Sequence, residues 1–273
     1  MAASLQGHQV HPGGRTWKSH FPKGDLWVFG YGSLIWKPPP HYDQRVPGYI
    51  EGYVRRFWQA RGGVFYFRLG MFTDHRGTLE QPGRVVTVIE RTFWETLDDP
   101  LANAESESAS TGKVWGAAYH IPSSHAEEVH DYLDEREIDG YSVHYTPFYP
   151  FSEGSSKSSG DDSGPIICMV YIGQPTNPQF LRDPAQRDPQ DVARVISTGH
   201  GQSGKGTEYL YLLEKALEGL GLGTADVHVT DLVRRVKAIE AVGEGEKEEK
   251  EAEKSVRQSL ATAGAVAEDD NIE

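Results

Sequence analysis

Runs of β-branched and aromatic residues predict five strands in the first two thirds of the chain. Each run is bounded by Gly, Pro or polar residues, as is typical of a strand between turns. The runs lie at residues 26–32, 84–90, 113–121, 142–151 and 166–173. We therefore expect a sheet built largely from these segments.

Apolar residues at helical spacing predict four helices, most of them late in the chain. They lie at residues 123–137, 188–198, 207–221 and 229–243. Ser124 and Glu127 have the spacing of a capping box in the first helix. Asp188 followed by Pro189 is a typical start for the second. Because strands dominate the first two thirds and helices the last third, without repeating βαβ units, the order predicts an α+β fold with a mixed or largely antiparallel sheet.

Four segments lack this periodicity. Residues 1–24 and 152–165 are predicted to be flexible, and residues 98–112 form a predicted loop between strands. Residues 241–273 are acidic and have no apolar stripe to bury, so we expect a disordered tail. What remains is one predicted domain over residues 25–240, which is long enough to bury a full core.

The net charge of −13 argues against nucleic acid as the main partner, because phosphate binding needs a basic face. Residues 240–273 hold eleven acidic and four basic side chains, so −7 of that charge belongs to the tail. No apolar run reaches the roughly 18 residues of a membrane span, so no membrane partner is expected. The sequence pattern does not indicate whether the protein is a monomer or an oligomer.

Two features bear on the compartment. The first 24 residues lack the apolar core of a secretory signal, although their basic, acid-poor composition leaves a transit peptide as an alternative. Cys168 is the one cysteine, so no disulfide can form within the chain. Both features favour a reducing compartment, and we expect a cytoplasmic protein.

Residues 28–36, Val-Phe-Gly-Tyr-Gly-Ser-Leu-Ile-Trp, contain two glycines that suggest a loop of bare backbone. A dinucleotide-binding loop needs a third glycine and a following helix, whereas here three prolines follow at 38–40. Two interpretations stay open. The segment is either a glycine turn in a β core or a loop whose N–H groups bind a carboxylate or carbonyl oxygen.

Other motifs do not support a metal, a cofactor or an enzyme nucleophile. Residues 199–207 resemble a phosphate loop, but Gly206 stands where Ser or Thr is required. His125 and His130 are five residues apart, not the four that place two ligands on one helix face. There is no G-x-S-x-G motif. We expect no metal and no cofactor.

Glu137 is the most informative carboxylate. On a helix that reaches it, Glu137 falls on the inward stripe with Ala126, Val129 and Leu133. A carboxylate that points inward is costly unless it is paired or takes part in chemistry. Two alternatives stay open: a salt bridge to a buried arginine such as Arg84 or Arg136, or a general base.

With these features in hand, the sequence resembles the ChaC branch of the γ-glutamylcyclotransferases. Seven blocks carry the resemblance in the family's order and cover roughly residues 25–220. They are residues 28–38, 47–59, 73–90, 114–121, 132–141, 170–181 and 201–213.

The resemblance implies a small mixed β-barrel flanked by helices and the conversion of glutathione to 5-oxoproline and cysteinylglycine. It implies that Glu137 is the catalytic residue and that the Tyr-Gly-Ser-Leu loop holds the γ-glutamyl group, with Tyr209 on a further wall of the site. The substrate-binding residues that we expect on this basis are Val28, Phe29, Gly30, Tyr31, Gly32, Ser33, Leu34 and Tyr209.

The chain departs from the family pattern at residues 60–72, where about two residues are expected and thirteen stand. The insert is an added hairpin, an exposed flap or a translated intron. Long segments at 98–112 and 152–165 and the acidic tail are further departures. Two alternative functions follow: a non-catalytic γ-glutamyl-binding scaffold whose insert blocks turnover, or a cyclotransferase for other γ-glutamyl amino acids.

Overall fold

The computed structural model describes residues 16–61, 83–107, 112–137, 141–151, 164–201, 204–221 and 226–269. Residues 62–72 of the insert and residues 152–163 therefore lie outside the described part of the chain. Within the described part, none of the helices is both long and apolar enough to span a membrane.

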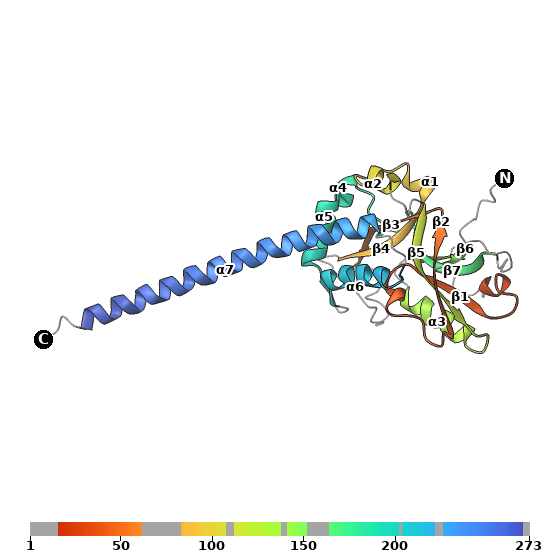
Figure 1. Cartoon of the computed structure of the whole chain (residues 1–273), viewed down its shortest axis with the longest axis horizontal. Coiled ribbons are helices and arrows are strands. Elements are labelled where there is room, and N and C mark those ends of the chain that lie inside the picture. The colour runs from red at the N-terminus through yellow and green to blue at the C-terminus, as the bar shows by residue number, and fades with distance from the viewer. Residues whose placement is uncertain are drawn as a thin grey trace.

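Five strands close into a barrel in the order β1-β5-β2-β6-β7. β1 and β7 pair in parallel at Val28 and Met169, and the other four pairings are antiparallel. The expected mixed β-barrel with flanking helices is confirmed (Figure 1). The strands are β1 (Leu26–Gly30), β2 (Gln44–Glu51), β5 (Lys113–Ile121), β6 (Tyr141–Pro150) and β7 (Ile166–Gly173).

Two paired glycines make room for aromatic side chains inside the barrel. Gly48 of β2 lies opposite Gly116 of β5. A Cβ atom at Gly48 would lie 2.5 Å from the Phe148 ring, and one at Gly116 would lie 2.7 Å from the Phe29 ring. The two rings, with centroids 5.6 Å apart, fill the space that the missing side chains leave. The core is thus packed to a density that tolerates no added methyl group here.

A second sheet pairs β3 (Tyr53–Arg61) with β4 (Gly83–Glu90). The hydrophobic pattern predicts β4 but not β2 or β3. Pro47 lowers the strand signal of β2, because proline cannot donate to a sheet. Arg55 and Arg56 interrupt the apolar run of β3, yet both are buried, and Arg56 pairs with Asp99 at 2.7 Å. These two strands are therefore set by contacts distant in sequence.

The helices flank the barrel and the second sheet (Figure 1). Asp188 accepts hydrogen bonds from the N–H groups of Gln190 and Asp191, which confirms it as the cap of α5. The predicted capping box at Ser124 is wrong, because the residue at the cap position of α3 is His125. The N–H of His125 donates to the carbonyl of Pro122, which closes a turn before the helix. The bounds are α1 (Arg91–Trp94), α2 (Ala102–Glu107), α3 (Ala126–Arg136), α4 (Pro184–Arg187), α5 (Pro189–Thr198), α6 (Gly206–Glu218) and α7 (Val227–Asp269).

Helix α7 departs from the sequence expectation. Its first turns pack on α5 and α6 through buried Val229, Leu232 and Val236. Beyond residue 240 it leaves the body and continues to Asp269, where a disordered tail was expected (Figure 1). Glu, Lys and Ala have high helix propensity, and pairs such as Glu246 and Lys250 stand at the stabilising i,i+4 spacing. Helix α2 likewise occupies part of the predicted loop 98–112.

Short elements complete the described chain. They are the 3₁₀ helices η1 (Thr16–Ser19) and η2 (Ser33–Ile35) and the two-residue strands β8 (His200–Gly201) and β9 (Gly204–Lys205). The β8–β9 hairpin occupies the segment that resembles a phosphate loop, and α6 begins directly after it.

Candidate active site

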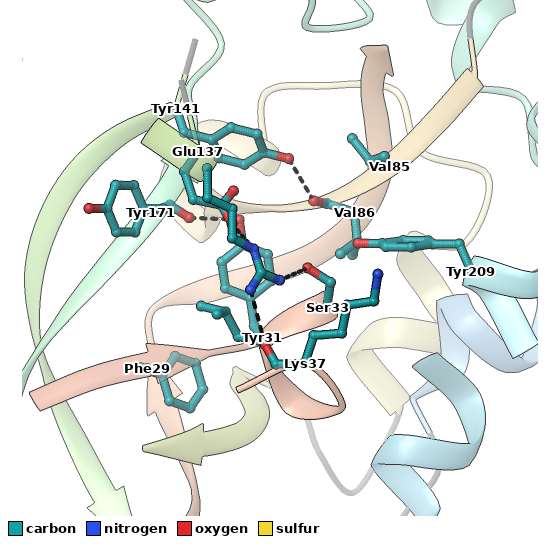
Figure 2. Close-up of a pocket in the computed structure, with 13 residues that line it drawn as sticks. Phe29, Tyr31, Ser33, Lys37, Val85, Val86, Glu137, Tyr141, Tyr171 and Tyr209 are labelled. Atoms are coloured by element: carbon teal, nitrogen blue, oxygen red, sulfur yellow. Dashed lines mark hydrogen bonds and ion pairs between the residues drawn. The ribbon is translucent and has the colours of Figure 1, made fainter. Parts of the chain in front are cut away.

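A pocket opens where the segment after β1 meets the end of α3. Figure 2 shows that its walls come from distant parts of the chain, with Tyr31, Glu137 and Tyr209 among them. The described lining residues are Phe29, Tyr31, Gly32, Ser33, Leu34, Lys37, Val85, Val86, Arg136, Glu137, Tyr141, Tyr171 and Tyr209.

The glycine-containing loop passes unusually close to the opposite wall. A Cβ atom on Gly32 would lie 2.8 Å from Cγ1 of Val86 and 3.3 Å from the hydroxyl of Tyr209. A side chain here would force these neighbours apart, so glycine permits the close approach. The helix that follows, η2, has only three residues, unlike the long helix that a dinucleotide-binding loop opens.

This loop also offers unused hydrogen-bond donors. The backbone N–H groups of Gly32, Ser33 and Leu34 donate to no residue in the described ranges. They stand at the start of η2, where the first N–H groups of a helix have no acceptor within it. All three residues line the pocket. Such donors on a pocket wall are suited to hold a carboxylate or a carbonyl oxygen that gains charge.

Arg136, the last residue of α3, ties the loop to the helix. Its guanidinium donates to Oγ of Ser33 at 2.9 Å and to the carbonyl oxygen of Lys37 at 3.1 Å. Its Nε lies 3.4 Å from Oε1 of Glu137. Because a guanidinium is planar and rigid, one side chain fixes the loop and the carboxylate relative to each other.

Glu137 is the first residue after α3, and its N–H donates to the carbonyl of Leu133 at 2.9 Å. Its side chain is 12% exposed and lines the pocket. The predicted inward stripe of Ala126, Val129 and Leu133 is confirmed, since all three are buried. The ion pair with Arg136 is present, and the carboxylate still borders the pocket, so the two alternatives from the sequence are compatible.

Three tyrosines support the walls. The hydroxyl of Tyr31 donates to the carbonyl of Tyr171 at 2.7 Å, and the hydroxyl of Tyr171 donates to Asp134 at 2.7 Å. Tyr141 donates to the carbonyl of Val86 at 3.2 Å. Burial raises the pKa of Tyr31 well above its usual value, with Tyr141 and Glu137 adding to the effect. Burial and then Asp134 raise the pKa of Tyr171 in the same way, so both stay protonated as donors.

Most of the residues predicted to bind substrate border this pocket: Phe29, Tyr31, Gly32, Ser33, Leu34 and Tyr209. Val28 and Gly30 are not among the lining residues. Val28 is fully buried in the barrel core, and Gly30 ends β1 behind Leu34, whose Cβ would lie 2.6 Å from a Cβ on Gly30. We expect these two to support the loop rather than to touch a ligand.

Sequence reasoning missed six lining residues, although each lies in or beside a block that it had singled out. Lys37 follows the glycine loop, and Arg136 directly precedes Glu137. The others are Val85, Val86, Tyr141 and Tyr171. On their own strands these four read as ordinary β residues, so the pattern gave no signal that they meet at one site.

A cluster of His41, His125 and Glu128 is the described group that most resembles a set of metal ligands, with ligand atoms within 4.8 Å of one another. The two imidazole rings stack face to face at 4.2 Å and 8°. Nitrogen lone pairs lie in the plane of each ring, so parallel stacked rings do not direct them at one ion. The Glu128 carboxylate lies 3.5 Å from His41 and 3.4 Å from His125. We assign this cluster no metal.

Comparison with known proteins agrees with this fold. The profile of the family described as ChaC-like protein matches residues 26–239. A glutathione-specific gamma-glutamylcyclotransferase of Schizosaccharomyces pombe is 40% identical over 222 residues, which cover 81% of this chain and 96% of that protein. Glutathione-specific gamma-glutamylcyclotransferase 1 of Homo sapiens is 32% identical, with 81% of this chain and 85% of that protein covered.

A solved structure gives the same result. The crystal structure of a gamma-glutamyl cyclotransferase specific to glutathione from yeast superposes with a TM-score of 0.65 at 34% identity. The match covers 78% of this chain and 96% of the yeast chain. A family profile over most of the chain, relatives at these identities and a shared fold lead to one conclusion: this chain belongs to the ChaC-like family.

Proposed function

We propose that the protein is a glutathione-specific γ-glutamylcyclotransferase, which converts glutathione to 5-oxoproline and cysteinylglycine. One observation of the site carries the proposal. Glu137, the one carboxylate among the described lining residues, and the N–H groups of the Gly32–Leu34 segment, which donate to no described residue, border the same pocket. The relatives that are named for this activity, in two yeasts and in vertebrates, support it.

The reaction needs neither water nor an enzyme nucleophile. The α-amine of the γ-glutamyl unit attacks the unit's own side-chain carbonyl carbon, which closes a five-membered ring. The new bond joins that nitrogen to the carbonyl carbon, and the bond from this carbon to the cysteinyl nitrogen breaks. Because the attack is intramolecular, the main task of the protein is to hold the substrate in a folded conformer.

Two protons pass from the attacking nitrogen to the departing nitrogen during the reaction, and one carboxylate can carry both in turn. Only the free amine attacks, so Glu137 as the carboxylate first removes a proton from the ammonium. The protonated side chain then gives this proton to the cysteinyl nitrogen as its bond to the carbonyl carbon breaks. The ring nitrogen still carries one proton more than a lactam, and the restored carboxylate transfers it to the freed amine, which leaves as an ammonium. Arg136, at 3.4 Å, holds the carboxylate toward the pocket through both steps.

The loop has a complementary role. When the amine attacks, the carbonyl oxygen of the substrate gains negative charge. The N–H groups of Gly32, Ser33 and Leu34 are candidates to hold either this oxygen or the substrate α-carboxylate. Tyr31 and Tyr209 complete the walls around the γ-glutamyl group. We place the activity in the cytoplasm and in one domain, residues 25–240.

The test is product formation by purified protein. We expect 5-oxoproline and cysteinylglycine in equal amounts from glutathione, and much less 5-oxoproline from γ-glutamyl-alanine at the same concentration. Chromatography with mass detection measures both products. Equal turnover of the two substrates would contradict glutathione specificity. Glutathione binding by calorimetry without any 5-oxoproline would favour the non-catalytic alternative.

A further inference from the structure

The described wall of the pocket carries charges of both signs. In the described lining, Glu137 is the one carboxylate, and the cations are Lys37 and Arg136. The guanidinium of Arg136 is engaged with Ser33, with the backbone of Lys37 and with Glu137. Its charge is therefore directed into the protein, and the ammonium of Lys37 is the other positive charge on the described lining.

The backbone of Lys37 is held firmly, so its side chain starts from a fixed point. Its N–H donates to the carbonyl of Ser33 at 2.8 Å, and its own carbonyl accepts from Arg136 at 3.1 Å. Three prolines follow at 38–40, which restrict the chain further. Lys37 is exposed, in contrast to the buried Tyr31 and Tyr209, so it stands at the mouth of the pocket.

Figure 2 shows where the side chain goes. It runs past Ser33 and ends on the Tyr209 side, while Glu137 and Tyr171 occupy the other side of the view. The pocket is thus polarised, with a carboxylate at one wall and an ammonium at the rim of another. A ligand with an ammonium at one end and a carboxylate at the other would match this arrangement.

Glutathione is such a ligand. Its γ-glutamyl end carries the reacting amine, and its other end is the glycine carboxylate. We propose that Lys37 binds the glycine carboxylate of glutathione and is a specificity-determining residue of the site. This inference rests on the proposed function, since it assumes that the γ-glutamyl unit lies between Glu137 and the glycine loop.

The consequence is a preference among γ-glutamyl compounds. Those that end in a carboxylate gain a charge-assisted contact at the rim, and γ-glutamylamines or esters do not. A hydrogen bond to a charged group is worth enough to change kcat/KM about tenfold. Lys37 takes no part in the chemistry under this proposal, so its effect falls on the selection of the substrate.

The experiment compares glutathione with its glycine ethyl ester, which lacks the distal negative charge, on the wild type and on Lys37→Met. Wild-type protein is expected to have about tenfold lower kcat/KM for the ester. Lys37→Met should lose about tenfold on glutathione and little on the ester, so the two substrates become equal. Lys37→Arg keeps the charge and should keep the preference. Lys23→Met, an exposed lysine outside the pocket lining, is the matched control and should behave as wild type.

Two outcomes would overturn the inference: Lys37→Met that loses the same factor on both substrates, or Lys37→Met that still prefers glutathione tenfold. Failure of the proposed function is a separate result, in which wild-type protein releases no 5-oxoproline from either compound. In that event, calorimetric titration of both compounds into the wild type and Lys37→Met gives the same comparison without turnover. Equal affinity of the wild type for acid and ester would then overturn the role of Lys37.

Discussion

Arg136 joins the two halves of the site through one planar group. It contacts the glycine loop at Ser33 and Lys37 and the carboxylate of Glu137, which lie about a hundred residues apart in sequence. A lysine in its place would keep a positive charge but could not hold all three partners in this geometry, because its ammonium is a compact charge on a flexible stem and lacks the planar fork. The geometry of the site therefore depends on the shape of the guanidinium as well as on its charge.

Arg136→Lys is expected to lower kcat/KM for glutathione by one to two orders of magnitude, because small displacements of a catalytic group are costly. The melting temperature should change by only a few degrees, since the side chain is near the surface. Steady-state kinetics and thermal unfolding measure the two effects. Arg194→Lys on α5 is the control, where the arginine pairs with Asp191 on an exposed face. Wild-type activity in Arg136→Lys would contradict a positioning role.

At this scale, the sequence identified residues whose types are unusual for their setting. Two glycines after a strand and a carboxylate on an apolar stripe both conflict with ordinary core packing, and both lie at the pocket or directly behind it. Tyr171 and Val86 are residue types that are ordinary in a β-strand, so the sequence did not single them out. Their place at the site follows from barrel closure and from the pairing of β3 with β4, which residue pattern alone does not specify.

The start of helix α7 is anchored by buried polar contacts to β3. Arg55 pairs with Asp226 at 2.7 Å, just before the helix begins. The N–H of Phe57 donates to Nε2 of His228 at 2.9 Å, so this ring is neutral with its hydrogen on Nδ1. Burial lowers the pKa of His228 well below its usual value, and the nearby Arg56 and Arg55 lower it further. Protonation of this ring would break the anchor.

The anchor predicts a pH dependence of stability. Below about pH 6.5 the unfolded chain takes up a proton at His228 that the folded chain does not. The free energy of unfolding should therefore decrease as the pH is lowered below that point. This group contributes up to about 1.4 kcal/mol per pH unit. Urea unfolding at pH 7.5, 6.5 and 5.5 measures the slope. His228→Gln, which does not titrate, should have a smaller slope.

Other histidines set the background for that comparison. Burial also lowers the pKa of His144, so it adds a slope of the same sign. His120 is partly buried, which lowers its pKa, but hydrogen bonds to Asp43 and Asp25 outweigh this and raise it. The stabilisation that His120 contributes is present at low pH and is lost as the pH rises through its raised pKa. Since both remain in His228→Gln, equal slopes in the two proteins would contradict the assignment to His228.

Strands were predictable from the sequence where the hydrophobic pattern of one continuous run of residues is sufficient to identify them. The strands at 113–121 and 166–173 are confirmed at both ends, because they are largely apolar and bounded by clear breaks. β3 was not, because the partners of Arg55 and Arg56 are Asp226 and Asp99, far along the chain. A buried arginine looks like a surface residue until its carboxylate is known.

In the whole molecule, the helix beyond residue 240 stands apart from the body that forms the site (Figure 1). Its described side chains from Glu244 to Glu251 are exposed, and Val236 is the last fully buried residue among those of α7 whose side chains the structure describes. A chain that ends at Gly243 should therefore keep kcat/KM within about twofold and its melting temperature within about 2 °C.

A deeper truncation provides the matched control. A chain that ends at Gly221 loses the buried stripe of Val229, Leu232 and Val236 and should fail to fold cooperatively. Circular dichroism and the glutathione assay compare the two chains. If the shorter deletion alone abolishes activity, the projecting part of α7 contributes to the site, contrary to this account.

The central claim is that Glu137 moves the protons of an intramolecular cyclisation of glutathione. The most direct measurement is the rate of 5-oxoproline release by Glu137→Gln beside the wild type, with melting temperatures recorded for both. Glutamine has nearly the same shape but cannot exchange a proton, so we predict a loss of about 10²-fold or more with the fold intact. A folded Glu137→Gln protein that releases 5-oxoproline at the wild-type rate would contradict the account.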